Sequence, residues 1–310
     1  MTIPLPVHAP EPPRRRLPPW LKRPLPPGDA MLRTRGLLDG LKLNTVCVEA
    51  RCPNLTECWT RGTATFMVLG DRCTRRCSFC AVDTAKPLPP EADEPERMAQ
   101  AAAHLNLRHV VITSVARDDL TDEGAGHFAR CIEAVRKRVP QATVEVLVPD
   151  FHGRRELIET VTQARPEVYN HNLETVRRLQ KYARPAARYE RSLDVLRIVR
   201  ELAPGMKTKS GIMVGLGETR DELLQALRDL HAAGCEMLTI GQYLRPGEGY
   251  APVERYYTPA EMDELGALAR GMGFSAVASG PFVRSSYFAE TLFAETDFLR
   301  GTSSDIKSSD

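Results

Sequence analysis

The feature that most constrains this chain is a set of three cysteines within eight residues, Cys73, Cys77 and Cys80, spaced C-x3-C-x2-C. A structural zinc ion takes four protein ligands, and no fourth cysteine or histidine lies nearby. Disulfide pairing would leave one of the three thiols unpaired. Three thiolates do suit a four-iron cluster in which one iron takes a ligand from outside the protein. We therefore predict an iron–sulfur cluster here; the alternative is three buried or zinc-binding thiols.

An aromatic residue, Phe79, directly precedes the last of these cysteines. With it, the motif resembles that of the radical S-adenosylmethionine superfamily. The resemblance implies that the free iron binds the amino and carboxylate groups of S-adenosylmethionine. It also places Phe79 among the cofactor-binding residues.

A second set of three cysteines, Cys47, Cys52 and Cys58, ends fifteen residues before the first set begins. Its spacing is C-x4-C-x5-C, again without a fourth ligand nearby. Pro53 and Asn54 favour a turn, so we expect this stretch to wrap around one object instead of forming a helix or strand. Its closeness to the first set predicts a second iron–sulfur cluster. The alternative is that the six cysteines share fewer metals, for example one zinc ion, and leave spare thiols.

The composition is that of an ordinary globular protein. The chain has 310 residues, 42% hydrophobic and 26% charged, enough for one large domain or two smaller ones. We expect no membrane span and no secretion signal, because no apolar run is long enough. The N-terminal arginines resemble a transit peptide, but the prolines there would break its amphipathic helix. We expect a cytoplasmic protein, in which eight cysteines indicate metal binding or catalysis rather than disulfides.

The N-terminal residues, 1 to about 30, are rich in proline and cannot form regular helices or sheet ladders. We expect an extended arm on the surface, ordered by what it covers. Its basic runs, 14–16 and 22–23, are either solvated tail residues or a patch that steers an acidic protein partner. The net charge of +2 is too small to indicate nucleic-acid binding. A short helix is expected at about 31–41.

From residue 63 onward, strand-like and helix-like segments alternate. Short apolar runs predict buried parallel strands at 63–69, 109–114, 143–148, 167–172, 207–214 and 236–244. Helical patterns fall at 95–104, 124–138, 154–164, 192–202, 220–233 and 258–272. Six units are fewer than the eight of a closed β/α barrel, so we predict an α/β fold, an incomplete and laterally open six-unit barrel. In such barrels the chemistry lies in loops after strand C-termini, where Cys73–Cys80 falls.

We divide the chain into four parts. Residues 1–30 are the arm, 31–62 an extension that binds the second cluster, 63–274 the partial barrel, and 275–310 a C-terminal extension. The last part opens with a candidate final strand at 275–280. The two cysteines outside the motifs, Cys131 and Cys235, are interpreted as buried structural residues.

Several strand ends carry candidate cofactor-binding residues. Gly215 and Gly217 let a ligand approach the backbone, so they border the S-adenosylmethionine site or make a tight strand-to-helix turn. Asn170 and Asn172 can hydrogen-bond a cofactor carboxylate or amide. His171 lies between them as a further site residue or as a satisfied interior histidine.

Two more residues are candidates for binding the methionyl carboxylate. These are Arg191 and Ser210, although a solvated arginine and a strand serine are the plainer interpretations. The polar loop 117–119 after the second strand reads as part of the barrel rim, and we assign it no role.

Near the C-terminus stands the run Arg284-Ser285-Ser286-Tyr287. Alone, its serines would indicate a turn or a helix cap. After the two three-cysteine motifs, however, the set of motifs resembles the lipoyl synthase family. The resemblance extends from about Asn44 to Tyr287.

This resemblance implies a function. The family inserts two sulfur atoms, at C6 and C8, into an octanoyl chain on a lysine of a lipoyl carrier protein. A cluster on Cys73–Cys80 would cleave S-adenosylmethionine to a 5′-deoxyadenosyl radical that abstracts hydrogen. A second four-iron cluster on Cys47–Cys58 would supply the sulfur and be consumed. Its fourth ligand would be Ser286, with Ser285 as the second choice.

The resemblance also implies partners. These are the octanoylated carrier protein, an electron donor such as a ferredoxin or flavodoxin, and an iron–sulfur carrier that rebuilds the second cluster. No nucleic acid and no membrane is expected. The alternatives are another two-cluster radical enzyme that inserts sulfur or transfers a methylthio group, and an iron–sulfur electron carrier or redox sensor.

Overall fold

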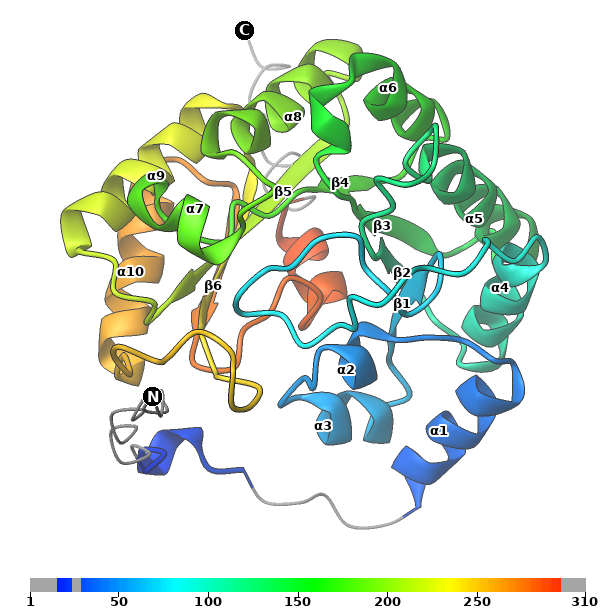
Figure 1. Cartoon of the computed structure of the whole chain (residues 1–310), viewed down its shortest axis with the longest axis horizontal. Coiled ribbons are helices and arrows are strands. Elements are labelled where there is room, and N and C mark those ends of the chain that lie inside the picture. The colour runs from blue at the N-terminus through cyan, green and yellow to red at the C-terminus, as the bar shows by residue number, and fades with distance from the viewer. Residues whose placement is uncertain (1–15, 24–28, 297–310) are drawn as a thin grey trace, which may run out of the picture.

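The computed structural model describes residues 16–23 and 29–296. Its centre is one parallel sheet of seven strands in the order β1 to β7, each paired with its neighbours in sequence. The strands are Thr65–Val68, His109–Ser114, Thr143–Leu147, Val168–Asn170, Lys207–Val214, Met237–Gln242 and Ala276–Gly280. Within the described residues no pairing joins β1 to β7, so the sheet curves into a barrel that stays open on one side (Figure 1). The predicted incomplete barrel is confirmed.

Helices cover the outer face of the sheet, as the crossover rule for parallel strands requires. They are α4 Glu94–His104, α5 Ala125–Arg138, α6 Arg155–Gln163, α8 Tyr189–Leu202, α9 Arg220–Ala232 and α10 Pro259–Gly271. The short helix α7, Gln180–Ala183, lies in the connection between β4 and α8, where the carbonyl of Ala183 accepts the backbone N–H of Ser78. Capping boxes begin α9 and α10, where Thr219 and Thr258 each accept a bond from the backbone of a glutamate three residues later. Cys131 and Cys235 are buried in the core beneath these helices, as predicted.

The sheet has one strand more than the six predicted units. The additional strand, β7, pairs with β6 from Met237 to Gly241 and corresponds to the candidate strand at 275–280. Its sequence, Ala-Val-Ala-Ser-Gly, is dominated by small residues with weak strand preference, so local pattern alone predicted it poorly. The barrel sheet therefore continues beyond residue 274.

The N-terminal part before the barrel contains more helix than predicted. After α1, Ala30–Gly40, the second cysteine stretch forms two short helices, α2 Val46–Glu49 and α3 Leu55–Thr60. The prediction that this stretch is not helical was wrong, because Thr45 caps α2 by accepting the backbone N–H of Val48. The expected turn at Pro53 and Asn54 separates the two helices.

The described part of the arm, 16–23, also contains a single 3-10 turn at Pro19–Leu21. Proline is tolerated in the first turn of a helix, so the prediction of no helix was too strict there. Residues 1–15 and 24–28 of the predicted arm lie outside the described residues, as does 297–310 of the predicted C-terminal extension. Across the described helices, none is long and apolar enough to cross a membrane.

After β7 the chain turns back into the barrel, and two glycines make room for it. A Cβ on Gly241 of β6 would collide with the carbonyl oxygen of Val283 and lie 3.2 Å from Nη1 of Arg284. A Cβ on Gly211 of β5 would lie 2.9 Å from the hydroxyl of Ser285. Both positions therefore require glycine, because backbone or a packed side chain occupies that space. The result is that segment 283–286 lies inside the barrel mouth.

Candidate active site

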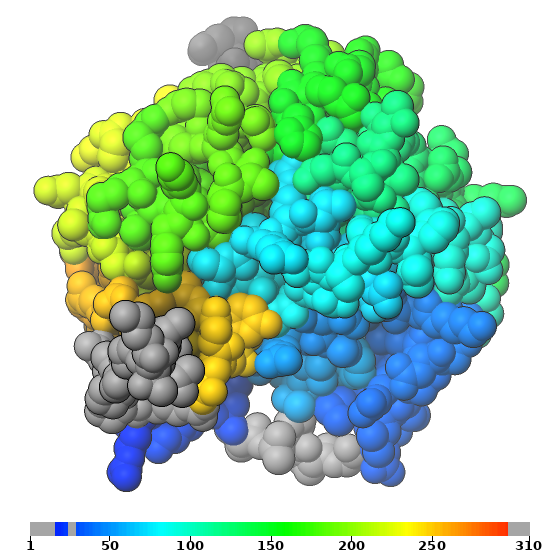
Figure 2. Space-filling model, viewed as in Figure 1, coloured from blue at the N-terminus to red at the C-terminus, as the bar shows by residue number. Residues whose placement is uncertain are grey.

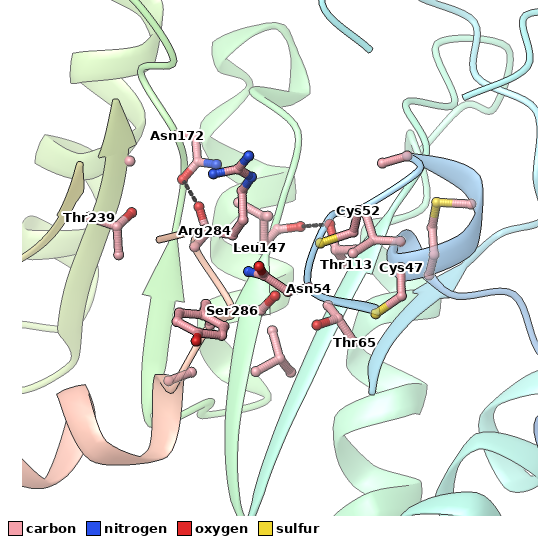
Figure 3. A pocket seen from close by; sticks show the side chains of 18 of the residues that line it. Cys47, Cys52, Asn54, Thr65, Thr113, Leu147, Asn172, Thr239, Arg284 and Ser286 are labelled. Carbon is pink, nitrogen blue, oxygen red and sulfur yellow. Dashed lines mark hydrogen bonds between the residues drawn. The ribbon is translucent and has the colours of Figure 1, made fainter. Parts of the chain in front are cut away.

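One cavity of about 800 Å³ occupies the barrel mouth and its open side. Both cysteine motifs line it, together with Arg284, Ser285 and Ser286. Figure 3 shows Arg284 and Ser286 between Thr239 of β6 and Asn172, two residues after β4, on one side and the stretch that carries Cys47 and Cys52 on the other. On the surface, the loop after β1, which carries the first motif, lies across the centre of this face (Figure 2). Segments that are far apart in sequence thus enclose one space.

The loop motif, Cys73, Cys77 and Cys80, follows β1 directly, as predicted for a catalytic loop. The Sγ of Cys73 accepts backbone N–H bonds from Arg75 at 3.4 Å and from Ala116 at 3.3 Å. Burial raises the pKa of Cys77 to about 11 and that of Cys80 to about 12. These thiols therefore stay protonated at neutral pH unless a metal displaces the protons. Three free thiols with backbone donors to sulfur are a fitting set for an iron–sulfur cluster.

A buried ion-pair network holds this loop in place. Arg75, the second residue after Cys73, donates from Nη2 to Asp118 at 2.7 Å and from Nη1 to Asp150 at 2.7 Å. Arg191 donates to the other oxygen of Asp150 at 3.1 Å. Burial alone would raise the pKa of Asp150, but the Arg75 guanidinium outweighs it and holds that pKa at about 2. The network joins the loop motif to the loops after β2 and β3, a role that the sequence did not reveal for Asp118.

We expect Arg75→Met to lower the free energy of unfolding of the cluster-free chain by about 3–5 kcal/mol, because it leaves Asp150 as a buried charge without its main partner. The pKa of Asp150 is held below its ordinary value, so the stability that this pair adds is present above about pH 4 and is lost as the pH falls toward 2. Urea unfolding at several pH values between 7 and 3 measures both effects.

The control for this experiment is Arg155→Met. The Arg155–Glu201 pair is exposed on the surface, so its loss should lower the free energy of unfolding by less than about 1 kcal/mol. Equal losses in the two variants, or a loss for Arg75→Met that does not shrink in acid, would contradict the assignment of the network as a buried anchor.

The N-terminal motif lines the same cavity, with Cys47 on α2, Cys58 on α3 and Cys52 between the two helices. Burial raises the pKa of Cys47 to about 11. Burial and the nearness of the other two thiols raise the pKa of Cys58 to about 12. The three sulfurs thus form one group that is short of a fourth ligand from cysteine, the same chemical situation as in the loop motif.

The two serines of the C-terminal segment differ in their contacts. The hydroxyl of Ser285 donates to Oδ1 of Asn172 at 2.9 Å and so belongs to the barrel side of the cavity. Ser286 also lines the cavity, and within the described chain its hydroxyl has no hydrogen-bond partner. Ser286 is therefore the hydroxyl that remains available for a ligand in the cavity.

Of the residues predicted to bind the cofactor, two line the cavity. These are Phe79, inside the loop motif, and Asn172, whose Nδ2 donates to Glu174 at 3.0 Å. His171 lines it too, but its ring is hydrogen-bonded to Val148 and Ser192, and burial lowers its pKa to about 4. His171 is thus a satisfied, neutral interior histidine.

The other predicted cofactor residues do not line this cavity and are engaged elsewhere. Asn170 donates to Glu145 at 3.0 Å, and the hydroxyl of Ser210 accepts the backbone N–H of Leu173 at 3.1 Å. Gly215 packs against Gln242, and Gly217 faces Glu254. Arg191 is turned to Asp150, as described above. Their cofactor roles stay predictions without a contact that supports them.

Sequence reasoning gave no role to several arginines that line the cavity, among them Arg184 and Arg284. Arg184, just after α7, donates from Nη1 to the backbone of Asn172 at 3.0 Å. Arg284 donates to the carbonyl of Val283 at 2.6 Å, and burial lowers its pKa. Within the part of the chain that is described, neither arginine forms an ion pair. The nearby charge of Glu174 partly offsets the effect of burial by raising the pKa of Arg284. The cavity thus carries positive charge that suits a carboxylate or another anion.

Comparison with known families gives two matches. The model of the radical SAM superfamily matches residues 67–230, and that of the N-terminal domain of lipoyl synthase of the radical SAM family matches residues 6–52. Curated relatives match over nearly the whole chain. The lipoyl synthase of Methylococcus capsulatus is 54% identical, over 93% of this chain and 89% of the relative. That of Rubrobacter xylanophilus is 54% identical, over 89% of this chain and 86% of the relative.

Solved structures share the fold at low sequence identity. The crystal structure of HydG, a maturase of the [FeFe]-hydrogenase, matches with a TM-score of 0.55 and 14% identity, covering 68% of this chain and 50% of that one. SuiB of Streptococcus suis bound to S-adenosylmethionine matches with a TM-score of 0.52 and 12% identity, covering 70% of this chain and 50% of that one. These two likenesses support the partial barrel alone.

Proposed function

The chain belongs to the lipoyl synthase family of the radical SAM superfamily, and from this premise we propose that it inserts two sulfur atoms, at C6 and C8, into an octanoyl chain carried by a lysine of a carrier protein. Membership makes the chain a radical SAM enzyme of the sulfurtransferase class, with a [4Fe–4S] cluster and S-adenosylmethionine as its cofactors. The substrate, the second cluster and the role of each residue are parts of the proposal.

The observation that carries this proposal is that both three-cysteine motifs face one cavity. Sulfur insertion at an unactivated carbon needs hydrogen removal and sulfur delivery at the same atom. A sulfur source elsewhere in the chain could not reach a short-lived carbon radical. Two sets of three cysteines that line one cavity meet that requirement, whereas an electron carrier needs no such enclosed space between its clusters.

In the proposed arrangement Cys73, Cys77 and Cys80 hold the radical-generating cluster. When bound, a reduced cluster of this kind supplies the electron that cleaves S-adenosylmethionine and yields a radical able to abstract hydrogen from a C–H bond. We assign the methionyl carboxylate to Arg184, which lines the cavity near Cys77 and, unlike Arg75, is not ion-paired with a carboxylate within the described chain. Arg75 anchors the loop, and Phe79 forms the wall beside the cofactor.

In the same cavity Cys47, Cys52 and Cys58 hold the second cluster, which is the sulfur donor and therefore a substrate of the reaction. Ser286 completes its ligand set, because the Ser286 hydroxyl is free while that of Ser285 is bound to Asn172. Apolar side chains that suit an octanoyl chain also line the same cavity, among them Val111 and Leu147. The carboxyl end of that chain, on its lysine, would face the carrier protein outside.

The proposal includes three expectations about partners and one about location. An octanoylated carrier domain brings the substrate, a small electron donor such as a ferredoxin or flavodoxin reduces the first cluster, and an iron–sulfur carrier rebuilds the second. A reducing cytoplasm suits six cavity cysteines that are all free thiols.

The test is anaerobic reconstitution of the chain with iron and heavy sulfide, followed by incubation with an octanoyl-lysine peptide, S-adenosylmethionine and a reductant. Mass spectrometry should find a lipoyl peptide with two heavy sulfur atoms, at no more than about one product per chain when no repair protein is present. A chain that cleaves S-adenosylmethionine but modifies tRNA instead would be a methylthio-transferring enzyme. A chain that does not cleave it at all would be an electron carrier or sensor.

A further inference from the structure

The described part of the N-terminal arm packs across the open side of the barrel. Nε1 of Trp20 donates to the carbonyl of Tyr257, just before α10, at 3.1 Å, and Leu21 is buried. Arg23, three residues after Trp20, forms an ion pair with α3, which lies on the other border of the opening. Figure 1 shows this segment, in dark blue, beside the α10 end of the sheet, while α3 lies beyond the opening. The arm thus touches both borders of the gap between β7 and β1.

Arg23 makes several contacts with two segments that the fold brings together. Its guanidinium is ion-paired with Glu57 of α3, and its Nη2 donates to the hydroxyl of Tyr287 at 3.3 Å. It also lies over the ring of Phe282, 3.7 Å from the ring centroid. The hydroxyl of Tyr287 in turn donates to the carboxylate of Glu57, at 3.0 and 3.1 Å from its two oxygens. The three polar groups form a closed triangle.

The sequence neighbours of this triangle are proposed ligands of the second cluster. Glu57 directly precedes Cys58, and Tyr287 directly follows Ser286. A hydrogen bond between Glu57 and Tyr287 therefore holds the backbones of those two ligands close to each other. Asn54, between Cys52 and Cys58, adds a second tie by donating to the carbonyl of Phe282 at 2.7 Å.

We propose that Arg23, Glu57 and Tyr287 form an arm staple, which positions Ser286 against the N-terminal motif and closes the open side of the barrel beside it. The three are positioning residues, since none of them supplies a thiolate or hydroxyl to the cavity as a ligand. The inference rests on the proposed function only in the role of Ser286. The staple itself is a property of the polypeptide, so it can be tested without any cluster.

The first test is hydrogen–deuterium exchange on the full cluster-free chain. The amide of Tyr287 is protected by a bond to the carbonyl of Arg284 at 3.0 Å, and it reports whether the C-terminal segment stays docked. Arg23→Met and Tyr287→Phe should each speed its exchange about tenfold, because each removes hydrogen bonds to a charged group. Arg35→Met, which removes only an exposed ion pair with Asp39 on α1, should leave it unchanged. Unchanged exchange in both staple variants would overturn the staple.

The second test measures the release of iron to a chelator from reconstituted chains. Arg23→Met and Tyr287→Phe should lose the second set of four irons several-fold faster than the parent, and the first set at the parent rate. Ser286→Ala separates this inference from the proposed function. If it changes neither release rate while Arg23→Met still speeds exchange at Tyr287, the staple stands and the ligand assignment fails. If Ser286→Ala speeds the release of the second set of four irons and the staple variants do not, Ser286 is the ligand but the staple does not position it.

Discussion

Cys52→Ala is expected to leave the reductive cleavage of S-adenosylmethionine intact and to abolish the sulfur-containing product. Cys52 belongs to the wall of the cavity that is proposed to donate sulfur, while the cleavage occurs on the loop motif. A cluster that has lost one of three thiolates is expected to be labile. Even the loss of a residue that only supports a metal ligand lowers metal affinity or activity about ten- to hundredfold. Product formation should therefore fall by more than about a hundredfold. The readouts are 5′-deoxyadenosine and lipoyl peptide, counted in the same reaction.

The matched control is Cys77→Ala in the loop motif. It should abolish both 5′-deoxyadenosine and the sulfur-containing product, since the radical arises at that site. Bound iron should distinguish the variants as well, about eight atoms per chain in the parent and about four in each variant. If Cys52→Ala still makes lipoyl peptide, or if the product takes its sulfur from sulfide in solution, the N-terminal motif is not the sulfur source.

The fold was largely predictable because its signals are local. Apolar runs for β1 to β6 and helical spacing for the outer helices are each readable within a short window of sequence. The errors arose where local preference is weak or is overridden. β7 is built from small residues and is defined by its pairing with β6. The helices α2 and α3 depend on a cap at Thr45 and on packing against the barrel, which turn residues alone do not reveal.

The candidate site divides in the same way. The cysteines were found because their ligand spacing is written in the sequence. Arg184 and Arg284 were missed, because nothing in the sequence shows which arginines the fold brings to the cavity without a carboxylate partner. The Arg75–Asp150 pair likewise joins residues seventy-five positions apart. Conversely, Asn170, Ser210 and Arg191 carry suitable chemistry, but neighbouring groups already use it.

The choice between two adjacent serines is the sharpest structural distinction at this site. The hydroxyl of Ser285 is held by Asn172 above Gly211, whereas that of Ser286 is free within the described cavity. Ser286→Ala should therefore keep the first cluster and S-adenosylmethionine cleavage, and should lower sulfur insertion by more than about tenfold. Ser285→Ala, the matched control, should retain most sulfur insertion, because it removes a hydrogen bond and no ligand.

Ser286→Cys adds a test of why a hydroxyl stands at this position. A thiolate is a softer ligand for iron than an alkoxide, so the cysteine variant should keep its second cluster more firmly against a chelator than the parent does. If the donor cluster must be dismantled to release sulfur, a firmer fourth ligand should slow product formation while 5′-deoxyadenosine continues to form. Faster iron loss in Ser286→Cys than in the parent would place the fourth ligand elsewhere. Equal product rates in the parent and in Ser286→Cys would show that ligand release at this position does not limit sulfur transfer.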